Sequence, residues 1–357
     1  MHVYVHIPFC NSICFYCDFC RCVSNQKEEY IQALEREVSS LSFSKIDTLY
    51  FGGGTPSSLS NEQLLCIGKM FQPYLNTDYE WTIECNPDSL SVDKIKGLKK
   101  LGVNRISLGV QTFNDALLKS IGRKHTVEDV NSCIHALKEN GFSNISVDLI
   151  YGLPNQSLED VKKDVQCFLS LDLPHLSIYS LQIEENSVFG QKRIEACDSD
   201  LEADMYEEIC SLLNQNGYVH YEISSFCKEG MVSRHNLSYW SDQDFVGIGC
   251  GASGKENNVR YDHTRNIKEY ISNPFYRDYV ETSDSDKEFE AIMMSFRSIF
   301  GLDVVSFNKK YNVDFYKKYQ NSIEKNKGYL NLDGKRVSVN EKGMELLNSI
   351  LLDFMLD

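Results

Sequence analysis

The chain has 357 residues, of which 42% are hydrophobic and 24% are charged, a composition that is ordinary for a globular protein in water. Its formal net charge of −15 argues against a nucleic-acid substrate, because phosphate binding requires a basic surface. No stretch is apolar over the length that a membrane span requires, and the residues before Cys10 leave no room for a signal peptide. We therefore expect a cytoplasmic protein whose 13 cysteines are reduced.

Short runs of β-type residues alternate with amphipathic helical patterns through the first half of the chain. Strands are expected at residues 3–7, 48–51, 81–84, 105–109, 146–150 and 176–182. The helices between them are expected at residues 27–41, 61–74, 92–101, 127–140 and 158–170. Six β/α repeats predict an α/β fold with a parallel sheet, most simply a partial (β/α)6 TIM-like barrel.

The chemically notable residues of this half follow the expected strands. Cys10 follows the first strand, a run of glycines follows the second, and Glu84 ends the third. Gln111 follows the fourth strand, and Asp148 lies late in the fifth. Because sites in such barrels gather where strands end and loops begin, this distribution supports the fold prediction.

The alternation of strand and helix patterns does not continue in the second half of the chain. Residues 224–264 are expected to be loop-rich, with four clustered glycines, and the pattern becomes helical again from Glu288. Two short β runs within residues 328–339 flank Asp333 and Gly334 and predict a hairpin, which a final helix follows. We therefore predict a barrel at residues 1–225, a loop-rich segment at 226–285, and a smaller winged-helix-like α+β region at 286–357.

Cys10, Cys14 and Cys17 form a C-x3-C-x2-C triplet. Three thiolates can hold three irons of a [4Fe–4S] cluster and leave the fourth iron open for a small molecule, whereas a pure electron carrier normally supplies a fourth cysteine. A zinc site or scattered core thiols are the alternatives. Cys20 and Cys22 would supply the fourth zinc ligand, although the chain has no second C-x2-C pair.

The triplet, with an aromatic residue before its third cysteine, resembles that of the radical S-adenosylmethionine (SAM) superfamily. The resemblance implies that the reduced cluster cleaves SAM to a 5′-deoxyadenosyl radical. Gly53, Gly54 and Thr55 then match the loop that grips the amino-acid end of SAM, since glycines let the backbone approach a ligand closely. A plain tight turn is the alternative.

Glu84 and Asp148 are acids in otherwise apolar strands. A buried carboxylate is costly unless it is paired or hydrogen-bonded, and either the SAM ribose and ammonium or a structural salt bridge would serve. Gln111 offers both a donor and an acceptor. Arg123 would clamp the SAM carboxylate, unless it is a solvated surface residue. Tyr4, six residues before the first cysteine, points either into the barrel or at the cluster.

A second constellation lies at residues 234–240, Arg-His-Asn-Leu-Ser-Tyr-Trp. His235 with Tyr239 and Trp240 would suit a flat porphyrin, with the imidazole as axial ligand to iron and the rings against the macrocycle. A hydrogen-bonded structural histidine is the commoner role for such a residue.

The motifs taken together resemble a known family over nearly the whole chain. Residues 4–10, 52–55, 108–111 and 148–154 look like the oxygen-independent coproporphyrinogen III oxidase superfamily, and residues 17–19, 221–224 and 233–240 look like its HemW branch of radical-SAM haem chaperones. The resemblance implies a [4Fe–4S] cluster, SAM and haem as cofactors. It implies cluster ligands at Cys10, Cys14 and Cys17, SAM contacts at Tyr4, Tyr16, Gly53, Gly54, Thr55, Glu84, Gln111, Arg123 and Asp148, and haem contacts at His235, Tyr239 and Trp240.

The resemblance implies a protein that binds haem and passes it to haem-requiring respiratory proteins without oxidising coproporphyrinogen. The oxidase carries an N-terminal segment that this chain lacks, and a further cysteine where this chain has Phe19. Oxidative decarboxylation of coproporphyrinogen III, or another radical-SAM reaction, remains the alternative, and SAM cleavage stays open. A low-potential donor such as a flavodoxin or ferredoxin is implied, a homodimer is compatible with the chain, and a membrane-bound recipient would place the protein at the inner face of the membrane.

Overall fold

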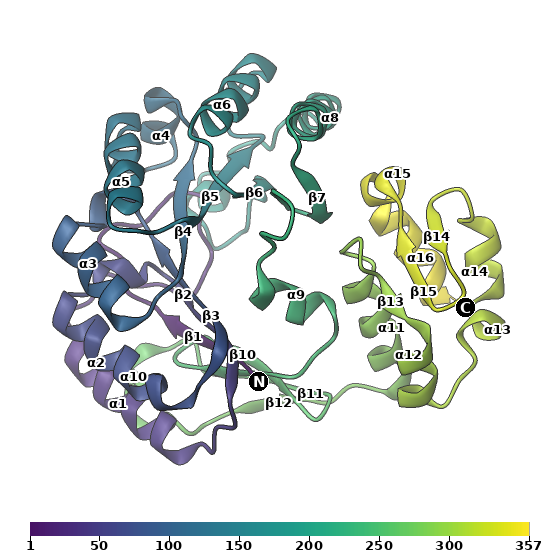
Figure 1. Ribbon diagram of the computed structural model, residues 1–357, viewed down its shortest axis with the longest axis horizontal. Coiled ribbons are helices and arrows are strands. Elements are labelled where there is room, and N and C mark those ends of the chain that lie inside the picture. The colour runs from purple at the N-terminus through teal and green to yellow at the C-terminus, as the bar shows by residue number, and fades with distance from the viewer. Residues whose placement is uncertain (357) are drawn as a thin grey trace.

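The computed structural model describes residues 1–356 and contains an α/β region joined to a smaller C-terminal region (Figure 1). Six parallel strands form the centre of a 12-stranded sheet, in the order β1 to β6. Their bounds are β1 His2–Ile7, β2 Ile46–Gly53, β3 Leu75–Cys85, β4 Arg105–Gln111, β5 Asn144–Tyr151 and β6 His175–Ser180. The intervening helices are α1 Lys27–Ser40, α2 Asn61–Phe71, α3 Val92–Leu101, α4 Asp115–Ser120, α5 Val127–Glu139 and α6 Leu158–Ser170. The prediction of an α/β fold with a parallel sheet is confirmed.

The core of this region lies between the strands and the surrounding helices. In β1, Val3, Val5 and Ile7 are fully buried in the main hydrophobic cluster, whereas the alternate residues Tyr4 and His6 face a cavity inside the sheet. The same alternation in the other strands puts polar side chains inside, because successive side chains of a strand point to opposite faces. The apolar packing that stabilises the sheet therefore leaves its concave side free for chemistry.

Further strands extend the sheet at both ends. On one side β9 Phe245–Ile248 pairs in parallel with β1, and β10 Ser253–Glu256, β11 Val259–Asp262 and β12 Asp278–Val280 continue antiparallel. On the other side β8 Ser225–Cys227 and β7 Val219–Glu222 follow β6. The helices between β6 and β12 are α7 Val188–Gln191, α8 Ser199–Gln215, α9 Arg234–Trp240 and α10 Ile267–Ser272.

Residues 224–264 therefore differ from the loop-rich segment that we expected. Each of the strands here is only three or four residues long, too short for an alternating pattern to stand out. The clustered glycines permit close strand contact, since a Cβ atom on Gly254 would lie 2.2 Å from the Tyr261 ring. The boundaries that we predicted at residues 225 and 285 stay predictions.

Gly247 in β9 packs so tightly against β10 that a Cβ atom there would lie 1.9 Å from the Ser253 carbonyl oxygen. Overpacking a filled site costs about 1–3 kcal/mol, and here the obstacle is backbone, so we expect Gly247→Ala to lower the free energy of unfolding by about 3 kcal/mol. Urea denaturation measures the change. Gly328→Ala is the matched control, because its Cβ would meet nothing within 4 Å, and an equal loss in both variants would contradict the packing argument.

The C-terminal region has its own hydrophobic core around Phe296, Phe315 and Phe354. A three-stranded antiparallel sheet in the order β13-β15-β14 includes the hairpin that we expected within residues 328–339. Its elements are α11 Asp284–Ser295, β13 Leu302–Asp303, α12 Val304–Tyr311, α13 Phe315–Lys318, α14 Gln320–Lys325, β14 Leu330–Leu332, β15 Arg336–Val339, α15 Glu341–Glu345 and α16 Leu347–Leu356. Over residues 1–356, none of the helices combines the length and the apolarity that crossing a membrane demands.

Polar contacts fix the C-terminal region against the sheet. The buried Lys255 of β10 pairs with Asp242 and Glu290, and Lys310 of α12 reaches the same Asp242 at 2.8 Å. Helix α9 contacts both β2 and α11, so it lies between the sheet and the C-terminal region (Figure 1). The motif at residues 234–240 is therefore placed at the junction of the two regions.

Candidate functional site

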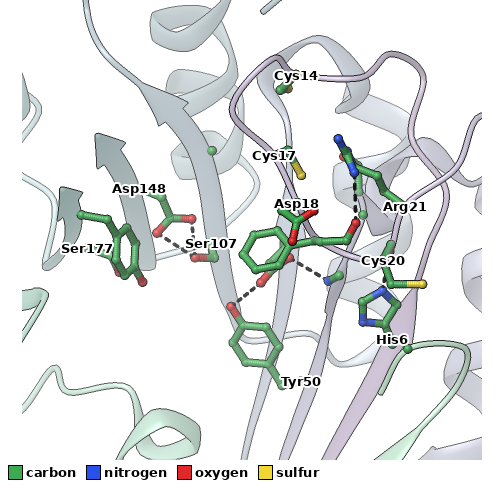
Figure 2. Close-up of a pocket in the computed structure, with 18 of the residues that line it drawn as sticks. His6, Cys14, Cys17, Asp18, Cys20, Arg21, Tyr50, Ser107, Asp148 and Ser177 are labelled. Carbon is green, nitrogen blue, oxygen red and sulfur yellow. Dashed lines mark hydrogen bonds between the residues drawn. The ribbon is translucent and has the colours of Figure 1, made fainter. Parts of the chain in front are cut away.

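A cavity of about 1120 Å³ opens on the concave side of the sheet. Its wall combines the loop after β1, the glycine loop after β2, the inward side chains of β3–β6, helix α9 and Met294 of α11. Figure 2 shows Cys14 and Cys17 on one side of this space and Tyr50, Ser107 and Asp148 on strands across from them. Every residue that we predicted for the cluster, for SAM and for haem lines this cavity, with the exception of His235.

The loop that carries the cysteines is fastened at both ends. The Cys10 amide donates to the Cys22 carbonyl at 2.9 Å, and the Cys22 amide donates to the Pro8 carbonyl at 2.7 Å. Arg265 donates to the Asp18 carbonyl at 2.5 Å and ties the loop to the segment after β11. These backbone bonds leave the three thiols free to face the cavity.

The three thiols fit a [4Fe–4S] cluster by their chemistry. Cys10, Cys14 and Cys17 are all free, all line the same space, and have few partners there: Cys10 Sγ lies 3.6 Å from Thr55 Oγ1 and Cys14 Sγ accepts from Arg123 at 3.5 Å. No group of three His, Cys, Asp or Glu side chains within residues 1–356 is placed to hold a single metal ion. A cluster differs in this respect, because it takes one thiolate on each of several irons.

The wall opposite the cysteines carries two half-buried carboxylates. Glu84 accepts from the Tyr50 hydroxyl at 2.9 Å and from the Gly53 amide at 3.1 Å, and burial raises its pKa to about 7. Asp148 accepts from the Ser107 hydroxyl at both oxygens, at 3.1 and 2.9 Å, and burial raises its pKa too (Figure 2). Neither acid forms an ion pair within residues 1–356, although the charges of Arg105 and Arg123 reach Asp148 and lower its pKa against the effect of burial.

The glycine loop at the end of β2 packs so closely against neighbouring groups that side chains would not fit there. Gly53 has a φ of 115°, and a Cβ on Gly54 would lie 2.8 Å from the Pro8 carbonyl carbon. A Cβ on Gly52 would lie 2.9 Å from the Glu84 carboxylate. The loop therefore brings backbone amides to the cavity wall where side chains would fill it.

Arg123 is the basic group nearest the cysteines on this wall. It donates to the Gly109 carbonyl at 2.5 Å and to Asn86 Oδ1 at 2.8 Å, and one of its nitrogens lies 3.5 Å from Cys14 Sγ. Gln111 beside it adopts the left-handed backbone conformation, with a φ of 72°. Arg123 is thus a half-buried residue of the cavity wall and not a solvated surface arginine.

His235 is the predicted residue that does not face the cavity. It lies in the first turn of α9, is almost fully buried, and stacks on Tyr50 with ring centroids 5.0 Å apart. Its Nδ1 is 2.7 Å from Thr48 Oγ1 and its Nε2 is 2.8 Å from the Tyr239 hydroxyl. Burial lowers its pKa to about 3, so the ring is neutral. The side chains of α9 that reach the cavity are Asn236, Tyr239 and Trp240.

Several cavity residues were missed at the level of the sequence. Tyr50, Arg105, Ser107 and Ser177 line the cavity from strands that we had located. Their positions follow from alternation, because Arg105, Ser107 and Gln111 all lie on the inward face of β4. Counting back by twos from Gln111 would have found Ser107 and Arg105.

Cys20, which the sequence offered as a fourth ligand of the alternative zinc site, lies beside Cys250. The two sulfur atoms are 3.9 Å apart, and Cys250 also donates to the Thr264 carbonyl at 3.2 Å. Cys20 still lines the cavity, next to His6, whose Nε2 contacts the Cys20 carbonyl at 2.7 Å (Figure 2). Nothing in the sequence indicates this pairing across 230 residues.

Comparison with known proteins agrees with this geometry. The profile of the radical SAM superfamily matches residues 4–168, and that of the HemN C-terminal domain matches residues 283–346. The superfamily implies SAM and a [4Fe–4S] cluster as cofactors. Among solved structures, coproporphyrinogen III oxidase HemN from Escherichia coli, described as a radical SAM enzyme, aligns with a TM-score of 0.86 over 99% of this chain and 89% of its own, at 24% identity. That likeness shows the fold.

Curated relatives place the chain more narrowly. The protein named heme chaperone HemW from Lactococcus lactis is 41% identical over 99% of this chain and 97% of its own length. The proteins of the same name from Bacillus subtilis and Escherichia coli are 40% and 35% identical, each over 86% of this chain and 86% and 85% of their own lengths. With its cysteine triplet and its α9 motif on one cavity, the chain belongs to the HemW family of radical SAM proteins.

Proposed function

We propose that this protein is a haem chaperone, which binds haem in the cavity and delivers it to haem-requiring proteins. The observation that carries the proposal is that one cavity joins the cysteine loop to Tyr239 and Trp240 of α9. Phe245 of β9 and Met294 of α11 add apolar surface to the same end. A macrocycle with apolar faces and an iron centre suits a wall that is aromatic at one end and polar at the other.

The cluster and SAM occupy the other end of the cavity in this proposal. Cys10, Cys14 and Cys17 hold the cluster, and SAM lies between it and the wall that carries Glu84 and Asp148. The cluster and SAM together supply radical or regulatory chemistry, with electrons from a low-potential donor such as a flavodoxin or ferredoxin. The recipient of haem is a respiratory haem protein, and a membrane-bound recipient would bring the chaperone to the inner face of the membrane as a monomer or homodimer.

Haem reaches the α9 motif in this proposal through a local rearrangement. The Tyr239 hydroxyl covers His235 Nε2 at 2.8 Å, so iron can bind that nitrogen only after the hydroxyl has moved. The imidazole is neutral because burial lowers its pKa to about 3, and a neutral imidazole is the form that coordinates iron. Tyr239 therefore acts as a gate over the iron ligand.

A haem titration tests the function directly. Cluster-reconstituted protein is titrated with haem under anaerobic conditions and followed by the Soret band. We expect saturable binding of about one haem per chain, and transfer of that haem to an apo-haem protein, as a protein with one such cavity requires. Absence of saturable binding would overturn the proposal, and consumption of SAM with loss of carboxylates from added coproporphyrinogen III would replace it with the oxidase activity.

The pH dependence of SAM binding tests the role of Glu84. Its pKa of about 7 means that the free protein carries a mixture of neutral and ionised Glu84 near neutral pH. A cation at this carboxyl favours the ionised form, so binding below the pKa must first remove a proton. We therefore expect SAM affinity to rise about fivefold to tenfold between about pH 6 and about pH 7.5.

Glu84→Gln is the control for this pH dependence, because glutamine keeps the shape and cannot titrate. Calorimetry of SAM binding across the same pH range should give a nearly flat profile in the variant. A slope as steep as that of the wild type would assign the proton to another group, of which Asp148 is the first candidate.

A further inference from the structure

Arg105, the first residue of β4, is a buried cation that the cluster and SAM do not explain. Its side chain is 1% exposed and lines the cavity. A guanidinium has five N–H donors, yet its only hydrogen bond is a long one, 3.4 Å from Nη2 to His175 Nδ1, and its Nε has no acceptor among the described residues. Lys255, equally buried, shows the usual arrangement, with Asp242 and Glu290 paired to it.

The neighbours of Arg105 do not neutralise it. His175 Nδ1 already lies 2.8 Å from Ser146 Oγ and its Nε2 lies 2.8 Å from the Tyr221 hydroxyl. Burial lowers the pKa of His175 well below its usual range, so the ring carries no charge. Arg105 forms no ion pair with a carboxylate of residues 1–356, although its charge reaches Asp148 and lowers the pKa of that acid against the larger effect of burial. An unpaired buried charge is costly, so a site that keeps one is incomplete without an anion.

The two acids of the cavity wall are engaged elsewhere. Asp148 is held by Ser107 at both oxygens, and Glu84 is held by Tyr50 and the Gly53 amide. Ser107 and Ser177, the latter opposite Asp148 in the β5–β6 pairing, lie beside Asp148 (Figure 2). Both serines line the cavity together with Arg105. Both hydroxyls are bonded to Asp148, so Arg105 is the group of this floor whose donors remain open to a ligand carboxylate.

Arg105 also lies close to the α9 motif. It pairs in register with Thr82 of β3, which pairs with Tyr50 of β2, and the Tyr50 ring stacks on His235 with centroids 5.0 Å apart. The Arg105 charge accordingly contributes to the lowered pKa of His235, after burial and His2. Haem carries an iron at its centre and two propionate carboxylates on one edge. If the α9 motif holds the haem iron, the propionate edge of haem lies at the same end of the cavity as Arg105.

We propose that Arg105 is the receptor for a haem propionate and sets the orientation of haem in the cavity. This inference rests on the proposed function, and it identifies the part of haem that the site recognises. It assigns recognition to the carboxylate edge and leaves iron coordination to the α9 motif. A charge-assisted hydrogen bond to a buried carboxylate then replaces the missing counter-ion.

The test compares haem with its dimethyl ester, whose propionates are esterified, on cluster-reconstituted protein. We expect the wild type to bind haem about tenfold or more tightly than the diester. Arg105→Gln should lower haem affinity by about the same factor, leave diester affinity nearly unchanged, and so remove the difference between the two. Arg105→Lys should restore part of this difference in affinity, because lysine keeps the positive charge but cannot donate two parallel hydrogen bonds to a carboxylate.

The controls separate recognition from folding. Arg36→Gln removes an arginine from the outer helix α1, whose guanidinium contacts only the Ile271 carbonyl, and should leave both affinities unchanged. Circular dichroism and the content of bound iron verify that each variant is folded. The comparison of haem with its dimethyl ester uses the wild-type protein, so this part of the test remains valid even if Arg105→Gln fails to fold. Equal binding of haem and diester by the wild type would overturn this inference alone. Absence of binding to either would overturn the proposed function and this inference with it.

Discussion

Replacing Cys14 by serine should abolish assembly of the [4Fe–4S] cluster. In the proposed function the cluster ligands are Cys10, Cys14 and Cys17, which all line the cavity, and two thiolates do not replace three. Cys14 is also the thiol that Arg123 contacts, at 3.5 Å, so its loss also removes the link between the cysteine loop and the SAM wall. Iron and acid-labile sulfide after anaerobic reconstitution should fall almost to background, and SAM binding should fall with them.

Cys66→Ser is the matched control for the cluster experiment, because Cys66 is an exposed thiol on α2. Its iron content should equal that of the wild type. Cys20 also lines the cavity, three residues after Cys17, and supplies the critical comparison. A cluster that survives in Cys14→Ser but is lost when Cys20 is also replaced would show that Cys20 serves as a ligand, and would contradict the assignment of three unique ligands.

The part of the fold that could be predicted is the part where burial follows a simple period. In β1, Val3 and Val5 face the helices and Tyr4 faces the cavity, and the order of the amino acids alone displays this alternation. Glu84 and Asp148 were found for the same reason, as acids in apolar strands. Both of these carboxylates line the polar cavity on the concave side of the sheet.

The extension of the sheet by β9 to β12 escaped prediction because tertiary contact, not local pattern, makes these strands. β9 has four residues, and its glycine packs on the backbone of β10. Likewise, Ser233 caps α9 by accepting from the Asn236 amide, but a helix of seven residues has no room for an apolar repeat. Short elements that depend on their neighbours carry little signal of their own.

The placement of His235 shows the limit of motif reasoning. The motif correctly points to a segment on the cavity, since Tyr239 and Trp240 line it. The sequence alone does not indicate which of its side chains faces inward, because that depends on how α9 docks against Thr48 and Tyr50. The role of His235 is therefore a question of chemistry that two substitutions can separate.

Replacing His235 by alanine should weaken haem binding by more than the roughly 10–100-fold that loss of an outer-shell partner typically costs. If His235 is the axial ligand, as we propose, this variant removes it, so the Soret band of any residual complex should lose the signature of histidine ligation. Haem titration and electron paramagnetic resonance of the ferric complex measure the two effects. Loss of the contacts to Thr48 and Tyr239 destabilises the fold independently of haem, and thermal unfolding of the haem-free variant measures this separate effect.

Tyr239→Phe distinguishes a gate from a ligand. The variant keeps the ring that lines the cavity and removes the hydroxyl 2.8 Å from His235 Nε2, so that nitrogen no longer has to give up a hydrogen bond before it meets iron. If His235 is the ligand, haem affinity should be retained or raised and the spectrum should still report histidine. If affinity collapses in Tyr239→Phe while His235→Ala keeps a high-spin complex typical of tyrosinate, the iron ligand is Tyr239 and the buried imidazole only orients it. The neutral His235 ring, held between Thr48 and Tyr239, would then be a positioning residue, and α9 would bind haem through the side chain that already faces the cavity.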